Sequence, residues 1–275
     1  MTPITAVITA KLRIAGHEIA GVRHQSKLKV GVISVSAVLL LTGFYLLMRE
    51  GFEFLVGMGA EGGAELNFAY VLMARMLGIL ALAIFLFLVF SNVLVAFSTM
   101  YRAHEVAYLI QSPMTFSDFF YARFFECVAF SSWSLAFLGA PMMLAYGLST
   151  GVSPAFYAAL AIFFVPYIIV PACIGAVIAM VLVRVFPRLN AKIMAALGAL
   201  AVLVFFFYIY RTFKGTRVSE DTILSVFLDA TARTQSPLLP SHWAAQGVLA
   251  AARHDFRAAG YWLLMLFSTA LFALR

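Results

Sequence analysis

Few residues in this 275-residue sequence have types and spacing suited to catalysis or metal binding. His17 and Glu18 are adjacent, but the second histidine of a zinc-protease helix is missing. Cys127 and Cys173 both lie in apolar segments, which favours buried thiols over a disulfide or a metal site. The Gly-x-x-x-x-Gly-Lys-Ser/Thr loop that holds nucleotide phosphates does not occur in the sequence. These residues therefore predict no catalytic residue, no metal site and no cofactor bound by this chain, and hence a protein that is not an enzyme.

A polar stretch at residues 101–118 interrupts two long apolar segments. Residues 102–111 contain no Gly or Pro, and their apolar side chains recur at helical spacing, which predicts a short amphipathic helix on the membrane surface. Pro113 ends this helix, and Ser117 and Asp118 suit the cap and first turn of the next one. A surface helix joined to a span on either side can transmit force from a soluble partner into the membrane.

The composition places these residues in a membrane protein. The chain is 64% hydrophobic and 11% charged, against roughly a quarter charged in soluble domains. Its repeated apolar runs predict an all-α polytopic membrane protein. The expected spans lie at about 30–48, 67–100, 119–147, 155–186, 193–210 and 260–275. The last run is short for a crossing, so we expect the natural chain to continue past Arg275.

The segments outside these spans are expected to be helical as well. Residues 1–29 form either a basic amphipathic helix in the headgroup region or an ordinary basic tail. The long loop 211–259 is predicted as two helices, capped by Ser219 and Ser241 and separated by a break at 236–240. Residues 49–66 are predicted as a Gly-rich outer loop. Lys and Arg are commoner in the segments assigned to the inner side, which favours a cytosolic N-terminus.

Three residues in or near the spans have alternative interpretations, and a fourth bears on the class of transporter. Pro166 and Pro171 should kink the fourth span, either as gating hinges or as packing kinks. Trp243 either anchors an external helix in the interface or contacts substrate, and we favour the anchor. Glu126 is the one carboxylate clearly within an apolar segment. A secondary transporter usually has ionisable residues near the midplane, so this scarcity disfavours one.

The order of elements resembles the membrane subunit of an ABC-2 type exporter. Residues 105–113, Glu-Val-Ala-Tyr-Leu-Ile-Gln-Ser-Pro, are similar to that family's acidic–Leu–Ser-Pro coupling segment. Residues 239–243, Leu-Pro-Ser-His-Trp, resemble a Leu-Pro-Ser-x-Trp element of some bacterial ABC permeases. The resemblance implies that 1–29 is a connecting helix, 101–118 a coupling loop, 30–275 the transmembrane domain and 211–259 an external re-entrant gate. The ATPase-coupling residues that it implies are Arg102, His104, Glu105, Tyr108, Leu109, Ser112 and Pro113, and the gate or hinge residues are Pro166, Pro171 and Trp243.

The function implied by this resemblance is that of the permease subunit of an ABC exporter, working with a cytosolic ABC ATPase that binds ATP and Mg²⁺. A second permease subunit or half and the lipid bilayer are the other expected partners, and no nucleic acid is expected. The expected location is the bacterial inner membrane, with several spans and a cytosolic N-terminus. The alternatives are an ATP-independent secondary transporter and a membrane-embedded enzyme or assembly scaffold. Glu105 either contacts the ATPase or is a solvated carboxylate.

Overall fold

The computed structural model describes residues 27–60, 63–98, 116–185, 203, 207 and 236–274. Every regular element in these ranges is an α-helix. The helices are α2 (Lys27–Ala60), α3 (Gly63–Phe97), α5 (Phe116–Thr150), α6 (Pro154–Val185), α9 (Pro240–Ala252) and α10 (Phe256–Ala273). Helices satisfy their own backbone hydrogen bonds, which is the condition for crossing a lipid layer.

Five of these helices are long and apolar enough to cross a membrane, judged by length and composition. The stretches that meet this condition are Leu28–Gly57, Val71–Phe97, Phe120–Thr150, Pro154–Val185 and Phe256–Ala273. They confirm an all-helical protein of the polytopic membrane type and five of the expected apolar helices. The expected span at 193–210 lies outside the described residues except for Leu203 and Phe207, so a six-span arrangement is not established.

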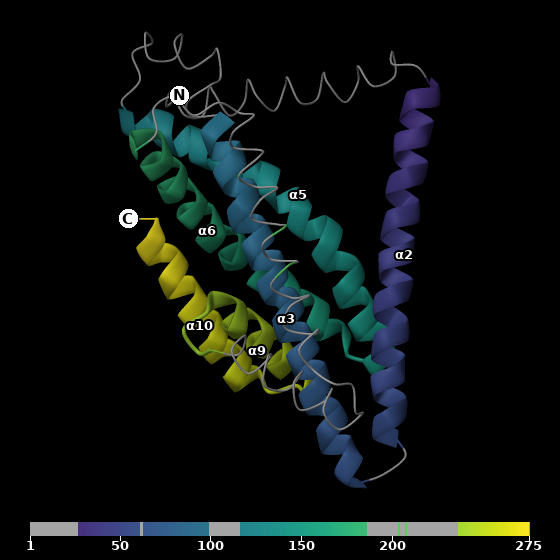
Figure 1. Ribbon diagram of the computed structural model, residues 1–275. Helices are drawn as coiled ribbons and strands as arrows, with labels where there is room; N and C mark the ends of the chain where they lie inside the picture. Colours follow the sequence, from purple (N-terminus) through teal and green to yellow (C-terminus); the bar gives the residue numbers. More distant parts are fainter. Residues whose placement is uncertain are drawn as a thin grey trace.

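The bundle is built around α3, which contacts α2, α5, α6 and α9 (Figure 1). The helix α2 packs against α3 and α5 near its C-terminal end and diverges from them toward Lys27. The helices α9 and α10 form a hairpin that packs against α6, and α9 also reaches α3. In Figure 1 α9 lies in the lower half of the molecule, where the α5–α6 turn also lies, and α10 runs upward from it to the C-terminal end.

The predicted outer loop at 49–66 is wrong, because α2 continues to Ala60 and α3 begins at Gly63. Phe52 and Leu55 are buried in the bundle, and this burial stabilises the extra turns. Arg49 Nε donates to Glu53 Oε1 at 2.6 Å across one helical turn. At 1.5 Å per residue, Arg49 lies about 33 Å along the axis from Lys27, close to the ~30 Å thickness of the hydrocarbon layer. The helix α2, which continues to Ala60, is thus longer than such a layer is thick.

A chain of aromatic rings ties α2, α5 and α6 together in the core. The Phe52 ring centroid lies 5.4 Å from that of Tyr146, and Tyr146 lies 5.8 Å from Phe156. Phe156 in turn lies 5.3 Å from Tyr157 in an edge-to-face arrangement. Phe52 and Phe156 are completely buried. This row of rings fixes the position of the α5–α6 turn against α2.

The helices α3 and α6 cross very closely at Gly175. A Cβ atom at this glycine would lie 2.6 Å from Asn92 Cβ and 3.0 Å from the backbone nitrogen of Val93. Asn92 is fully buried at this crossing, and its Nδ2 donates to the carbonyl oxygen of Leu88 at 2.8 Å. The absence of a side chain at Gly175 therefore sets the distance between the two helices.

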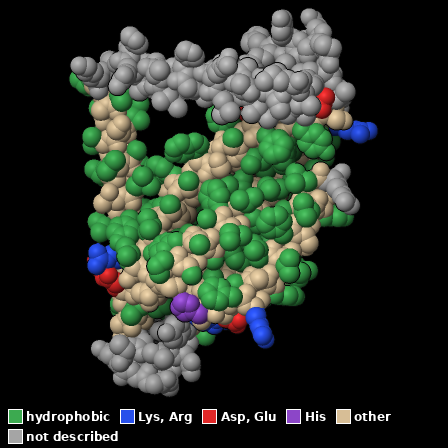
Figure 2. Space-filling view, turned by 180° about the vertical axis from the view of Figure 1, so that it is seen from behind, with side chains coloured by type: hydrophobic (Ala, Val, Ile, Leu, Met, Phe, Trp, Pro, Cys, Tyr) green, Lys and Arg blue, Asp and Glu red, His purple; other side chains and the backbone are tan. Residues whose placement is uncertain are grey.

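The outer surface of the bundle is apolar over most of its height. Figure 2 shows hydrophobic side chains across the middle of one face and charged side chains near its margins. On α2 the exposed side chains include Val32, Leu39, Leu47 and Phe54. A soluble monomer rarely exposes apolar patches of this extent. The surface fits a hydrocarbon environment.

The connection between α9 and α10 is a tight αL turn. The amide nitrogen of His254 donates to the carbonyl of Ala251, and that of Asp255 to the carbonyl of Ala250. These bonds form a Schellman motif, in which His254 takes the left-handed position with φ 61°. The Asp255 side chain then caps α10 by accepting from the amide nitrogen of Ala258 at 3.1 Å.

The start of α9 differs from the sequence prediction. Residues 236–239 form a turn, with the amide nitrogen of Leu239 donating to the Ser236 carbonyl at 3.1 Å, and the helix predicted before this turn lies outside the described residues. The predicted Ser241 cap is wrong, because Leu239 is the N-cap and makes no side-chain cap bond. Pro240 takes the first helical position, where its missing N–H costs nothing. Ser241 lies inside the helix and is fully buried.

The other predicted cap, Ser117, also lies within its helix, because α5 begins at Phe116. Asp118 is in the first turn of α5, as expected.

Candidate functional site

The predicted coupling residues lie outside the part of the chain that the structure describes. They are Arg102, His104, Glu105, Tyr108, Leu109, Ser112 and Pro113. Their proposed contact with an ATPase therefore stays a prediction. The connecting segment 1–26 and most of the external loop, 211–235, also lie outside the described residues.

The two predicted hinge prolines lie in the middle of one continuous helix. Pro166 and Pro171 are both fully buried in α6, which runs without interruption from Pro154 to Val185. Each proline removes one backbone hydrogen bond from the helix. Both rings are packed within the bundle, but burial alone does not show a bend of the helix axis. A kink at this point therefore stays a prediction.

Trp243 holds the turn that leads into α9. Its Nε1 donates to the carbonyl oxygen of Pro237 at 2.7 Å. The neighbouring His242 ring meets the Trp262 ring of α10 edge to face, with centroids 5.6 Å apart. Burial lowers the pKa of His242, which favours its neutral form. These contacts fix the start of α9 on α10.

An apolar cavity of about 350 Å³ lies between α3, α5, α6 and α9. Much of its space exists because the helices present small side chains to it. Seven of the lining residues are Ala81, Ala136, Gly139, Ala140, Ala161, Ala244 and Ala245. Larger residues, including Met142, Phe163 and Val248, complete the walls. A cavity of this size is within the range of small-molecule sites, which span roughly 300–1,000 Å³.

Two tyrosines carry the polar side-chain groups of the cavity wall. Both direct their hydroxyl groups at the surrounding protein. The Tyr167 hydroxyl donates to the carbonyl oxygen of Ala81 on α3. The Tyr157 hydroxyl lies against Gly147, where a Cβ atom would come within 2.4 Å of it. The cavity therefore offers an apolar ligand hydrocarbon and ring surfaces, and few groups that could bind a polar one.

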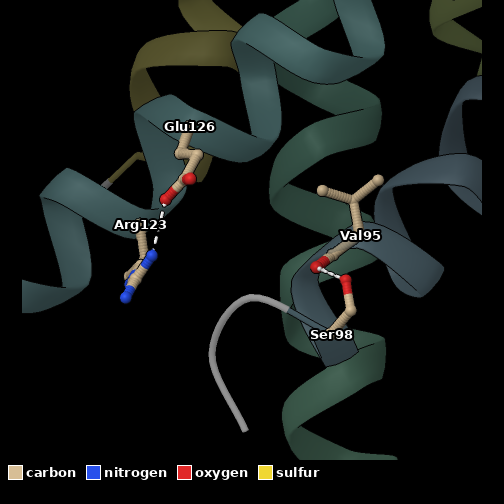
Figure 3. Close-up of polar contacts among 4 residues, drawn as sticks. All are labelled: Val95, Ser98, Arg123 and Glu126. Atoms are coloured by element: carbon tan, nitrogen blue, oxygen red, sulfur yellow. Dashed lines mark hydrogen bonds and ion pairs between the residues drawn. The ribbon is translucent and has the colours of Figure 1, made fainter. Parts of the chain in front are cut away.

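A second candidate feature is an ion pair within α5 (Figure 3). Arg123 Nη1 donates to Glu126 Oε2 at 2.8 Å, and the Arg123 side chain is only 3% exposed. Ser98, at the end of α3, donates to the Val95 carbonyl at 2.9 Å in the same view. Glu126 stood out in the sequence, whereas its pairing with Arg123 was missed although the three-residue spacing permits it. Ionisable side chains inside spans are rare and often functional.

The described residues contain no group of three or more His, Cys, Asp or Glu side chains placed to hold a metal ion. Cys127 and Cys173 are buried free thiols. Within these ranges the bundle is largely apolar, and α5 carries the partly buried Arg123–Glu126 ion pair.

Comparison with known proteins gives one match. A family model described as "Putative ATP-binding cassette" matches residues 22–274, nearly the whole chain. No curated protein and no solved structure matches this chain.

This family match corrects three sequence predictions. The identification as an ABC-2 type exporter permease, the permease function and the assignment as a non-enzymatic subunit without ATPase motifs are contradicted, because the family is described by an ATP-binding cassette and not as permeases. These predictions used the order of helices, and an arrangement of helices can serve many functions. The phosphate-binding loop remains absent from the printed sequence, so the match assigns no residue of this chain to nucleotide. The chain, whose described residues include five helices long and apolar enough to cross a membrane, belongs to this family, described as "Putative ATP-binding cassette".

Proposed function

We propose that this chain is a membrane-embedded component of an ATP-binding cassette transporter, with a cytosolic ATPase among its partners that binds ATP and Mg²⁺. The observation that carries the proposal is the set of five long apolar helices in a chain whose family is an ATP-binding cassette family. Apolar helices of this length belong in lipid. Nucleotide phosphates need backbone amides and a lysine arranged around them, and the sequence lacks the loop that supplies these groups.

The location of the chain, its orientation in the membrane and its contact with the ATPase are proposed from the distribution of charge. We place the chain in the inner membrane of a bacterium with its N-terminus in the cytosol, because Lys and Arg favour that side. The contact with the ATPase is proposed at residues 102–113, where Glu105 supplies a charge for a basic partner group. A second copy of the chain, or a related half, completes the assembly.

Nucleotide photolabelling tests this proposal. The tagged chain is purified from its native membrane, irradiated with 8-azido-ATP, and both the chain and any copurified protein are examined for label. Label on a copurified soluble ATPase supports the proposal. Label on this chain, purified alone, would show that the chain itself binds ATP. This result would contradict the proposal that ATP binds to the ATPase partner.

The contact segment has its own test. Glu105→Ala should reduce copurification of the ATPase, whereas Glu50→Ala, at an exposed position on α2, should not. Equal recovery of the ATPase with both variants would remove Glu105 from the contact.

A further inference from the structure

The apolar cavity between α3, α5, α6 and α9 has a floor inside the bundle and a mouth on its surface. Ala81, Ile84, Phe163, Tyr167 and Val248 line it and are buried. Three other lining residues, Ala136, Ala140 and Ala161, are exposed. The first two are on α5 and the third is on α6. The cavity therefore opens between α5 and α6.

This mouth faces the same environment as the outer surfaces of α5 and α6. Both helices are candidate spans, and their exposed side chains near the mouth, Phe137 and Ile162, are apolar. In a membrane-spanning bundle such a surface meets lipid hydrocarbon. The side chains at the mouth are methyl groups, which leave room for a chain to pass.

The groove between α2 and α5 adjoins this cavity. It has a volume of about 440 Å³ and is lined in part by Leu41, Tyr45 and Trp133. Ala136 and Ala140 border both spaces. A hydrocarbon chain in the groove therefore lies next to the α5 side of the cavity.

From these observations we infer that the cavity binds one acyl chain of a phospholipid from the surrounding bilayer. The ligand is a hydrocarbon because the tyrosine hydroxyl groups at the wall are directed at protein and few other polar groups are present. An apolar cavity of about 150 Å³ already takes up benzene, and this one is more than twice as large. The phospholipid headgroup would remain outside, at the membrane surface. The inference rests on the membrane-embedded part of the proposed function and is independent of any ATPase.

Photocrosslinking of the wild-type chain in nanodiscs tests the inference. The probe is a phosphatidylcholine with a diazirine near the end of one acyl chain, and adducts are mapped by mass spectrometry. Met142 lines the cavity and is only 1% exposed, so it reacts only with a chain inside the cavity. Adducts at Met142 are expected. Adducts confined to outward-facing residues such as Leu40 and Phe54 would overturn the inference.

Two matched variants provide an independent readout. Ala140→Phe fills the mouth, whereas Ala129→Phe adds the same ring at an exposed position on α5 that does not line the cavity. Adduct formation at Met142 should be lost in Ala140→Phe and kept in Ala129→Phe. Equal labelling of Met142 in both variants would overturn entry of the acyl chain through this mouth. If Ala140→Phe does not fold, Ala161→Phe blocks the mouth from α6, and the wild-type map alone still decides the question.

A diazirine fatty acid in a parallel sample identifies the source of the chain. Stronger labelling of Met142 by the free fatty acid than by the phospholipid, at equal membrane concentration, would replace the phospholipid with a fatty acid. Failure of these experiments leaves the ATP photolabelling result untouched, because the nanodiscs contain this chain alone.

Discussion

Substitution of Gly175 by alanine is expected to force α3 and α6 apart. The added Cβ atom would lie 2.6 Å from Asn92 Cβ and 3.1 Å from the Asn92 carbonyl carbon. Carbon atoms pack best at about 3.5–4.0 Å, so the helices must separate by roughly 1 Å at this crossing. Two of the atoms that would be approached, Asn92 C and Val93 N, are backbone atoms, so no side-chain rotation relieves the clash. Overpacking of this kind costs about 1–3 kcal/mol.

Gly43→Ala is the matched control. Gly43 is exposed on α2, and an added Cβ atom would meet nothing within 4 Å. Replacing a glycine inside a helix by alanine stabilises it by about 0.5–1 kcal/mol. Gly175 also lies inside a helix, so this gain applies to both variants, and their stabilities should differ by the overpacking cost of roughly 1–3 kcal/mol.

Cysteine reactivity during a thermal ramp measures this difference. Cys127 and Cys173 are both buried and free, so a thiol-reactive dye reports the loss of packing. For a protein of this size each kcal/mol shifts Tm by about 2–4 °C, so Gly175→Ala should melt roughly 2–12 °C below Gly43→Ala. A Tm at or above that of Gly43→Ala would show that α3 and α6 do not approach this closely.

Three other substitutions probe the charged and capping residues. Glu126→Ala removes the 2.8 Å carboxylate partner of the Arg123 guanidinium and should lower stability by about 1.5–3 kcal/mol in dye-reported melting, the usual size of a hydrogen bond to a charged group. His254→Gly should raise stability by about 1–2 kcal/mol in the same assay, because glycine takes the left-handed φ of 61° without strain. Burial lowers the pKa of His242 below its usual 6.5, so the unfolded chain binds a proton more readily than the folded one. Stability should therefore fall as the pH drops from about 6.5 through the folded pKa and then level off, and His242→Gln should remove this slope when Tm is measured against pH.

The apolar helices were predictable because each depends on a continuous local pattern. The expected span at 119–147 lies within α5, and the one at 155–186 matches α6 up to Val185, the last described residue there. The extent of α2 was not predictable from hydropathy, because Arg49 and Glu53 read as a loop until their pairing across one turn is known. Ser241 has the residue type of a cap, but the preceding Pro240 takes the first helical position and puts the serine inside the helix. The preference of a single residue type predicted the structure only where no neighbouring residue favoured a different position for it, as Pro240 does for Ser241.

The candidate site was less accessible to sequence reasoning. The cavity is lined by Ala81, Ala136, Ala161 and Ala244, which come from four helices distant in the chain. Alanine carries no chemical signature, so only the packing of the helices shows that these residues share a space. The family assignment was missed for a related reason, since the order of helices specifies an arrangement and not an activity.

The helix α9 has a consequence for how the protein is made. Its 13 residues span about 20 Å, too short to cross a hydrocarbon layer of about 30 Å. One face of α9 packs into the bundle: Ala244 and Val248 are part of its core, and Gly247 lies against the Phe163 ring of α6. Alone at a membrane surface, the helix would leave this face without its packing partners. Membrane helices insert singly and associate afterwards. The helix α9 must therefore enter after α3 and α6 have paired, so that the C-terminal hairpin closes the bundle as a late step of biogenesis.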